Sequence, residues 1–560
     1  MRTIHRFRLL ALMLGAALAL APAALARPVR HAHAVTGKLY PVGVHASRHS
    51  ASAQALAAAA SGPGSVYIRG ARPIPRSSST AAPLTATRPA AESDTLAAGT
   101  ASGALQANFN GVSSRDSAVT NFNAEFEPPD QGMCVGNGYV VEMVNSAYTV
   151  YKPNGTVVTG PFNVNGPFDE GLREFTSDPR CQYDAATHTW FATILFINAA
   201  GTVSRVDLAV NQSGDPTGPW TNYQIDTTDN GGSTGPKHPG CPCLGDQPTL
   251  GIDASNVYIT TNEFSLLGPQ YNGAQIYAIA KSDLTDQPVP TATPAHIVHF
   301  DELNIGGAVA SSVQPALTTG NAPAEYFLNS LDPNGTFDQR VGVWAMTNRG
   351  AVATGGKPTL SSVVLGSEAY GLPPASDQKG SSSQIDSGDD RMQQTQSIGG
   401  EVYGELTTSV TIPNDPSARA GAAWFDVHPS LSGGVLSGAN MRRQGYVTLS
   451  GNDVIYPALQ VTPSGNAAMV MTLTGTQHFP SAAYSLLAPG ATAFGPIHVA
   501  AAGTGSYDPN ATRWGDYSWA VLDPSLTSVW MATEYIPPKA SQTPDGARNW
   551  GTRVMEVSTG

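Results

Sequence analysis

Acidic, basic and amide side chains recur at two corresponding places along this sequence, and together they suit chemistry on a polyhydroxylated or anionic ligand. The first place is the start of one β-rich segment, and the second is the end of the β-rich segment that follows it. The polar residues at these places are Asp130, Asp178, Arg180, Asp246, Gln247, Gln314, Asp390, Arg391, Tyr456, Arg513, Asp516, Tyr517, Asn145, Asn262, Glu263, Asn329 and Glu534. Two carboxylates among Asp130, Asp178, Asp246, Asp390 and Asp516 would supply the general acid and the general base of a hydrolase or lyase.

The arginine and asparagine side chains in this set would bind a ligand rather than react with it. Arginine presents a rigid fork of donors that matches a carboxylate or neighbouring sugar hydroxyls. The candidate ligand-binding residues are Arg180, Arg391, Arg513, Asn145, Asn262 and Asn329. The alternative is structural, because Asp and Asn also cap turns, and Arg–Asp pairs also connect neighbouring units.

A weak sequence repeat determines where these residues would lie. The clearest unit contains three β-rich segments, at residues 246–253, 257–264 and 276–284, and similar units start near residues 130, 178, 246, 314, 390, 456 and 516. Neighbouring starts are 48 to 76 residues apart, which suits four short antiparallel strands and their loops. We therefore predict an all-β, seven-bladed β-propeller, with residues 108–111 supplying the outer strand of the last blade. Two β-sandwich domains are the alternative, which would explain the strands but not the recurring signature.

The propeller arrangement brings the polar residues together. The first two strands of a blade pair antiparallel, so the start of the first and the end of the second lie at the same end. The first strands line the central channel. We therefore expect the residues above to surround one end of the channel, which we call the mouth.

The N-terminal residues carry export signals. Residues 1–26 combine a basic start, an apolar stretch from Leu9 to Leu20 and the small-x-small sequence Ala24-Leu25-Ala26, as in a cleaved signal peptide. A membrane anchor is the alternative, but the apolar stretch is short for a span. Residues 27–105 are rich in Ala, Ser and Pro without a period, which predicts a disordered leader that is dispensable for folding. The propeller domain would then occupy residues 106–560, in a protein that is secreted or periplasmic and has no membrane span once mature.

Charge and cysteine content agree with an exported protein. The net charge is −12, and no basic block follows residue 30, so we expect no nucleic-acid partner. The four cysteines are Cys134, Cys181, Cys241 and Cys243. Of the three connectivities that four cysteines allow, we favour Cys134–Cys181 and Cys241–Cys243. Metal binding by Cys241-Pro-Cys243 with the nearby His238 is the alternative.

No motif in the sequence assigns a cofactor. Nucleophile-elbow, zinc-protease and dinucleotide-binding signatures are absent, and the histidines are scattered over different units. A structural Ca²⁺ held by the acidic runs at residues 386–390 or 226–229 stays open, because Ca²⁺ prefers oxygen ligands. Each run would otherwise be a solvated loop.

Several of these motifs resemble one known group of proteins. The motifs are Pro128-Pro-Asp130, Asp178-Pro-Arg180, residues 245–251, residues 261–264 and residues 513–518. Over residues 107–560 they look like largely uncharacterised exported bacterial propellers, which in turn resemble the sialidase-like, Asp-box superfamily. Residues 213–220, Ser-Gly-Asp-Pro-Thr-Gly-Pro-Trp, are similar to an Asp box with its glycine one place late. An Asp box is a turn and carries no catalytic residue.

The resemblance also implies roles for particular residues. Sialidases bind a carboxylate through three arginines and use a tyrosine nucleophile polarised by a glutamate, with a separate aspartate as acid/base. By this likeness Arg180, Arg391 and Arg513 would be the three arginines, and Tyr517 with Glu534 the nucleophile pair. The candidate catalytic residues are then Asp178, Asp246, Asp390, Asp516, Tyr517 and Glu534. The sequence departs from the family in lacking Arg-Ile-Pro at the first arginine, and Arg513 is out of register with the other two.

Three classes of function stay open. The chain is a carbohydrate-active hydrolase or lyase, a non-catalytic propeller that binds a glycan or a protein, or a structural or adhesive exported protein. A polysaccharide or glycoconjugate is the expected partner under the first class, and one of the partners expected under the second. A propeller hosts all three classes, so the fold cannot choose between them.

Overall fold

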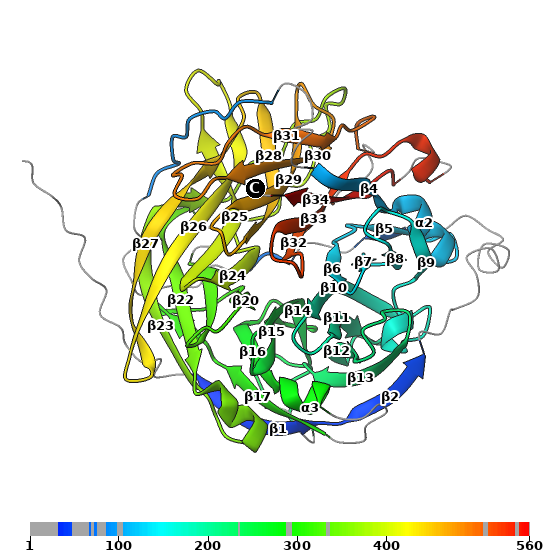
Figure 1. The fold of residues 1–560 in the computed structure, drawn as a ribbon, viewed down its shortest axis with the longest axis vertical. Helices are drawn as coiled ribbons and strands as arrows, with labels where there is room; N and C mark the ends of the chain where they lie inside the picture. The colour runs from blue at the N-terminus through cyan, green and yellow to red at the C-terminus, as the bar shows by residue number, and fades with distance from the viewer. Residues whose placement is uncertain are drawn as a thin grey trace, which may run out of the picture.

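The computed structural model describes residues 32–46, 66–68, 72–74, 86–97, 105–232, 236–286, 294–331, 336–507, 513–543 and 548–558. The predicted signal peptide lies outside these residues. The described part is mostly β, and its antiparallel meanders stand side by side around a common centre (Figure 1). This arrangement is that of a β-propeller. Among the described residues, no helix is long and apolar enough to span a membrane.

Each meander begins near the centre and ends at the rim (Figure 1). The first three meanders contain the strands β6 (Gly132–Gly136), β7 (Tyr139–Met143), β8 (Ala147–Tyr151) and β9 (Val157–Asn163); β10 (Phe175–Asp184), β11 (Thr189–Ile197), β12 (Ser204–Asn211) and β13 (Pro219–Asp226); and β14 (Cys243–Ile252), β15 (Asn256–Ser265), β16 (Tyr271–Ala280) and β17 (Ala295–Asp301).

The later meanders contain β20 (Gln314–Thr319), β21 (Glu325–Ser330), β22 (Phe337–Thr347) and β23 (Thr359–Gly371); β24 (Gln394–Ile398), β25 (Glu401–Thr411), β26 (Ala418–Ser432) and β27 (Val435–Val447); β28 (Asn452–Val461), β29 (Ala467–Gly475), β30 (Ser481–Leu487) and β31 (His498–Ala501); and β32 (Trp519–Leu522), β33 (Ser528–Tyr535), β34 (Gly551–Ser558) and β4 (Leu105–Ser113). The inner strand β20 also pairs in parallel with β14 on one side and with β24 on the other.

Apart from two strands near the N-terminus, the remaining elements are short and lie in connections. They are α2 (Ser114–Thr120), α3 (Lys281–Thr285), η1 (Gly166–Phe168), η2 (Arg349–Thr354), η3 (Lys539–Ser541), the paired β18 (Asn304–Ile305) and β19 (Ala308–Val309), and β3 (Val66–Ile68), which pairs with β5 (Glu125–Glu127).

The first and last parts of the chain complete one meander together. Strand β4 precedes β6 in sequence but pairs antiparallel with β34, with Asn108 opposite Met555 and Asn110 opposite Arg553. The prediction that residues 108–111 supply an outer strand is therefore confirmed. This pairing covers the edge of β34, which would otherwise expose unpaired backbone groups.

The leader is where the structure differs most from expectation. Strand β1 (His33–Leu39) pairs with β17, and β2 (Pro41–Ala46) pairs with β13, so both extend the rims of meanders. Residues 86–97 run along later rims, with isolated bridges from Ala86 to Phe337 and from Leu96 to Ile497. For these stretches the predicted disorder is wrong. An edge strand is held by backbone hydrogen bonds, which need no apolar period in the sequence.

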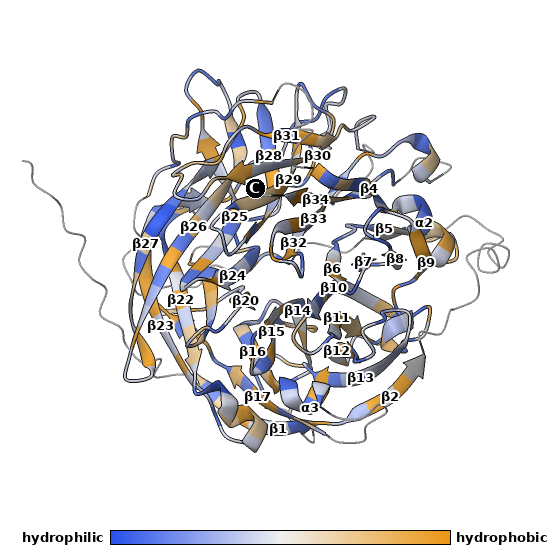
Figure 2. Ribbon diagram, in the orientation of Figure 1, coloured by the Kyte–Doolittle hydropathy of each residue, from blue (hydrophilic) through white to orange (hydrophobic). Residues whose placement is uncertain are grey.

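The core lies between neighbouring meanders. Most strands are buried on both faces because each sheet is covered by the next one around the ring, and all eight tryptophans have almost no exposed surface. The outer strand β27 differs, because most of its residues are partly exposed and it contains both hydrophobic and hydrophilic residues (Figure 2). The inner strands are therefore the most completely buried, whereas the rim is partly open to solvent.

Both predicted disulfides are present. Cys134 of β6 and Cys181 of β10 have Cα atoms 5.2 Å apart and join the inner strands of the first two meanders. These strands approach closely, since a Cβ on Gly132 would lie 2.6 Å from the Pro179 carbonyl oxygen. The second disulfide joins Cys241 and Cys243 in the loop before β14.

The Asp-box-like sequence forms the turn between β12 and β13. Asp215 Oδ1 accepts hydrogen bonds from the Thr217 backbone nitrogen, at 3.0 Å, and from its hydroxyl, at 2.7 Å. The Trp220 indole is buried and donates to the Pro216 carbonyl at 3.1 Å. The motif therefore has the structural role that the resemblance implies.

Candidate functional site

A bulge at the start of several inner strands directs residues toward the mouth. Asp178, Gln247 and Tyr456 have φ values of 56°, 49° and 51°, and each precedes a proline. The pairing register of β10, β14 and β28 shifts at these places. A left-handed non-glycine residue costs on the order of 1–3 kcal/mol, so surrounding contacts must stabilise it. The bulge explains why similar residues recur at the start of the first β-rich segment of each unit in the sequence.

Part of that stabilisation comes from the preceding meander. Asn145 Oδ1 accepts a hydrogen bond from the backbone nitrogen of Asp178 at 2.7 Å, and Asn262 Oδ1 accepts one from Ser312 at 2.8 Å. The Thr407 hydroxyl oxygen accepts the corresponding bond from Tyr456 at 3.0 Å. A polar side chain on or just after the second strand of one meander thus accepts a hydrogen bond from the backbone at the start of the next.

The predicted ligand-binding asparagines therefore have partners within the protein. The Asn145 amide nitrogen also donates to Asp130 Oδ2 at 2.8 Å, and the Asn262 amide nitrogen donates to the Ser312 hydroxyl at 2.9 Å. Asn329 differs, because it bonds within its own meander, accepting from the Trp344 indole at 2.8 Å. These amides serve the fold in the structure.

Three of the candidate carboxylates come together at the mouth. Single carboxylate oxygens of Asp130, Asp178 and Asp516 all lie within 4.8 Å of one another. Asp130 and Asp178 are fully buried, whereas the Asp516 side chain is 25% exposed. The Asp516 backbone nitrogen donates to Asp130 Oδ1 at 2.7 Å, which fixes the last inner strand against the first. An oxygen-only set of this kind suits a hard cation such as Ca²⁺.

Arg180 lies beside these carboxylates in an unusual environment. Its guanidinium carbon lies 3.1 Å from the centre of the Tyr517 ring and 4.7 Å from that of Trp519. Arg180 is fully buried, its Nε donates to the Pro248 carbonyl at 3.3 Å, and neither terminal nitrogen donates a hydrogen bond to a described residue. Burial lowers the pKa of Arg180, while Tyr517 and Asp178 oppose this effect. The geometry is that of a stacked structural cation.

The other two arginines form separate ion pairs. Arg391 makes a bidentate pair with Asp389, at 2.7 and 2.6 Å, and also donates to Gln247. Arg513 donates to Asp386 at 2.8 Å and pairs with Asp516. Each of the three arginines thus has its own partners. The three-arginine arrangement that the resemblance implies stays a prediction, since the charge of Asp516 acts on all three guanidinium groups.

The remaining catalytic candidates are buried. The Tyr517 hydroxyl donates to the Pro179 carbonyl at 3.3 Å, and its ring packs against Arg180. Glu534 is fully buried, and burial together with the Asp130 charge raises its pKa well above the ordinary value. Asp246 lies opposite Asn262 in the β14–β15 ladder, and Asp390 is fully buried. Asp516 is the candidate that reaches solvent most.

The acidic runs proposed for calcium have other partners. Asp386 and Asp389 are paired with Arg513 and Arg391, so the carboxylates of the first run already neutralise arginines. In the second run, Asp226 accepts from the Thr228 backbone nitrogen at 2.9 Å, and Asp229 lies near His238.

A cavity that the sequence did not predict opens on the mouth side of the third meander. Its volume is about 410 Å³, and its lining includes Tyr271, Asn272, Gln275 and His238. The Tyr271 hydroxyl donates to Asn262 Oδ1 at 3.1 Å, which places the cavity beside the end of β15. The nearness of His238 to Cys241-Pro-Cys243 was the available sequence signal, but nothing in the sequence pairs this loop with β16.

Comparisons with known proteins assign no family to the chain. No family model matches the sequence, and no curated protein matches it. The structure is similar to the GH93 α-L-arabinofuranosidase of Fusarium graminearum, at 10% identity, covering 80% of this chain and 97% of that one, with a TM-score of 0.35. It is also similar to Trypanosoma rangeli sialidase, at 8% identity, 83% and 59% coverage and a TM-score of 0.34. A third similar structure is the Penicillium chrysogenum α-L-arabinanase, at 11% identity, 80% and 98% coverage and a TM-score of 0.34.

Proposed function

We propose that the chain is an exported seven-bladed β-propeller whose mouth face binds carbohydrate without hydrolysing it. The seven blades are the meanders described above, the last one completed by β4. The observation that carries the binding proposal is the 410 Å³ cavity beside the end of β15. Ligand cavities in proteins are typically about 300–1,000 Å³ in volume.

The lining of the cavity suits a neutral polyhydroxylated ligand. Tyr271, Asn272 and Gln275 supply both donors and acceptors, and the ring of Tyr271 adds an apolar surface for a sugar face. Arg391 lies near enough to affect the pKa of Tyr271, but it is ion-paired with Asp389. We therefore expect a glycan with few or no charged groups.

The absence of hydrolysis follows from the state of the mouth carboxylates. Asp130, Asp178 and Glu534 are fully buried, so a glycosidic oxygen cannot approach them without a rearrangement of the blades. A glycosidase needs two accessible carboxyl groups about 5–9.5 Å apart.

The binding proposal is tested by calorimetric titration with neutral and acidic polysaccharides. We expect binding of a neutral polysaccharide, no release of reducing ends, and at least a tenfold loss of affinity in Tyr271→Ala. A matched control is Tyr446→Ala, which changes a tyrosine lining a different cavity and should keep the affinity. Failure of all the polysaccharides to bind would overturn the proposal.

A second candidate function is a hydrolase or lyase at the mouth. It is favoured by the convergence of Asp130, Asp178 and Asp516 within 4.8 Å. Here the most exposed carboxylate, Asp516, would be the group that meets substrate. Release of reducing ends by the wild type, lost in Asp516→Asn with unchanged melting temperature, would establish this function and reject the binding-only proposal.

The location of the protein is part of the same proposal. Residues 1–26 would be cleaved after Ala26, and the two disulfides suit an oxidising compartment. N-terminal sequencing of the protein from the periplasm and the medium should find a chain beginning at Arg27. Recovery of an uncleaved chain from the cytoplasm would contradict export.

A further inference from the structure

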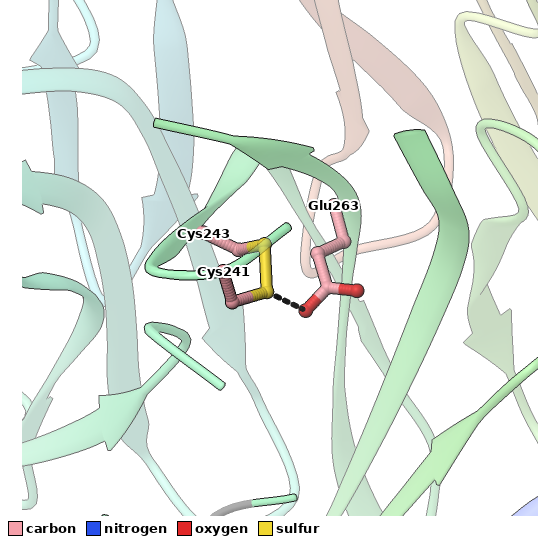
Figure 3. Close-up of side chains that lie close together, drawn as sticks. All are labelled: Cys241, Cys243 and Glu263. Carbon is pink, nitrogen blue, oxygen red and sulfur yellow. Dashed lines mark hydrogen bonds between the residues drawn. A yellow bond between two sulfur atoms is a disulfide. The ribbon is translucent and has the colours of Figure 1, made fainter. Parts of the chain in front are cut away.

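A buried cluster of one histidine and three carboxylates lies under the 410 Å³ cavity. Glu263 is on β15 and Asp301 is the last residue of β17, while Asp229 and His238 come from the connection between β13 and β14. The three carboxylate residues are each at most 2% exposed. Figure 3 shows Glu263 beside the Cys241–Cys243 disulfide, with Cys241 Sγ 3.8 Å from Glu263 Oε1.

Both ring nitrogens of His238 face carboxylates. Nε2 lies 3.2 Å from Asp301 Oδ2, and Nδ1 lies 2.9 Å from Glu263 Oε1 and 3.8 Å from Asp229 Oδ2. An ionised carboxylate only accepts hydrogen bonds, and a neutral imidazole has only one N–H to donate. If Nε2 donates to Asp301, the Nδ1 lone pair points at two more acceptors. Nδ1 therefore needs either a second proton or a bound cation to face these carboxylates.

A second proton on His238 would supply only part of the charge required. In the described part of the chain, the ion pairs of the three carboxylates are with His238 and with His33, whose side chain is 60% exposed. Neither oxygen of Asp229 accepts a hydrogen bond from a described residue, although Asp229 is 2% exposed. A buried ionised carboxylate without a donor is costly, so Asp229 carries a proton unless a cation neutralises it.

We propose that Asp229, His238 and Glu263 bind one divalent cation of the zinc type. One ligand atom from each lies within 4.8 Å of the others, which is the spread that a single ion spans. A set of one imidazole and two carboxylates favours Zn²⁺ or Mn²⁺, whereas Ca²⁺ prefers oxygen ligands alone. Asp301 is the positioning residue, because its bond to Nε2 orients the imidazole and directs Nδ1 to the ion.

Of the three proposed ligands, only His238 lines the cavity, so the imidazole lies between the cavity and the two carboxylates. The disulfide keeps the sulfur atoms of Cys241 and Cys243 out of the ligand set, and it lies in the same connection as His238, beside Glu263. This inference is independent of the binding of carbohydrate.

The test is metal uptake by the purified full chain under non-reducing conditions. The protein is treated with a chelator, dialysed, and titrated separately with ZnCl₂, MnCl₂ and CaCl₂ by calorimetry, with metal content measured by mass spectrometry. We expect about one zinc or manganese ion per chain, and an increase in melting temperature on adding zinc. Asp229→Asn and His238→Ala should each lose at least 100-fold in affinity.

Two controls separate metal binding from folding. His296→Ala removes a histidine that pairs with a single carboxylate, Asp283, and should keep full uptake. Asp229→Asn removes a buried negative charge, so without metal it should unfold at the same temperature as the wild type or higher. No uptake of zinc or manganese, uptake of calcium alone, or undiminished zinc binding by Asp229→Asn would overturn the proposal.

Discussion

The mouth and the His238 cluster are both rich in buried carboxylates, but they are neutralised differently. At the mouth, Arg391 and Arg513 form short ion pairs with Asp389 and Asp386, and Arg180 is stacked on Tyr517. In the cluster, three carboxylates share His238 and the exposed His33. Buried carboxylates that lack a compensating positive charge therefore indicate a ligand site. The number of carboxylates alone does not. The mouth is largely a structural network, whereas the cluster is incomplete without a cation.

The largest effect should come from removing the central cation of the mouth. Arg180→Ala would leave Asp130 and Asp178 buried without the guanidinium beside them, and it would open a cavity under Tyr517. We expect the free energy of unfolding to fall by about 3–5 kcal/mol in denaturant titration. Arg442→Ala, which removes a 55% exposed side chain, should change it by less than about 0.5 kcal/mol. An unchanged stability of Arg180→Ala would mean that Arg180 is free to bind a ligand.

The two disulfides should also differ in their effects, one on stability and the other on zinc binding. Cys134–Cys181 closes a loop of 47 residues between two blades, so replacing both cysteines with serine should cost about 2–4 kcal/mol. Cys241–Cys243 spans two residues, and its replacement should change stability little but weaken zinc binding, because the loop carries His238. Denaturant titration and zinc calorimetry on both variants check this contrast. Equal losses of stability would break it.

A carboxylate of a third kind provides a pH test. Glu142 is fully buried on β7 and accepts from the Val112 backbone nitrogen at 2.8 Å. Burial raises its pKa from 4.5 to about 7. Because the folded state binds this proton more tightly than the unfolded state, the contribution is fully present below pH 4.5 and is lost as the pH rises to 7.

The loss in that window should be on the order of 3 kcal/mol for this group. The Glu142→Gln variant has no titrating group there, so its unfolding free energy should vary less with pH than that of the wild type. Melting temperatures measured from pH 4 to 8 compare the two proteins. Identical pH dependence would show that folding does not shift the pKa of Glu142.

The smallest of these effects should come from a single connection between blades. Asn145→Ala removes the acceptor for the Asp178 backbone nitrogen and a donor to Asp130, at a cost of about 2 kcal/mol. Asn329→Ala, whose amide bonds within one blade, should leave zinc uptake and carbohydrate binding unchanged. A loss of carbohydrate binding in Asn145→Ala at full stability would restore Asn145 to the ligand-binding residues.

The sequence alone determined the strands and their order, because short β-rich segments and a recurring strand start are local features. Residues 246–253 and 257–264 are found in β14 and β15, and residues 108–111 lie in the closing strand β4. Both disulfides were also predicted. The leader strands β1 and β2 were missed, since an edge strand depends on the partner that it pairs with, which the sequence does not show.

Only the tertiary structure decided what the polar residues do. The sequence predicted that Asn145, Arg180 and Asp178 lie at one mouth. It did not show which of them would form hydrogen bonds between blades. The His238 cluster draws on β15, β17 and the connection before β14, so no spacing along the chain predicts it. Whether a charged side chain is compensated depends on neighbours that are distant in sequence, and this distinguishes a structural carboxylate from a candidate ligand.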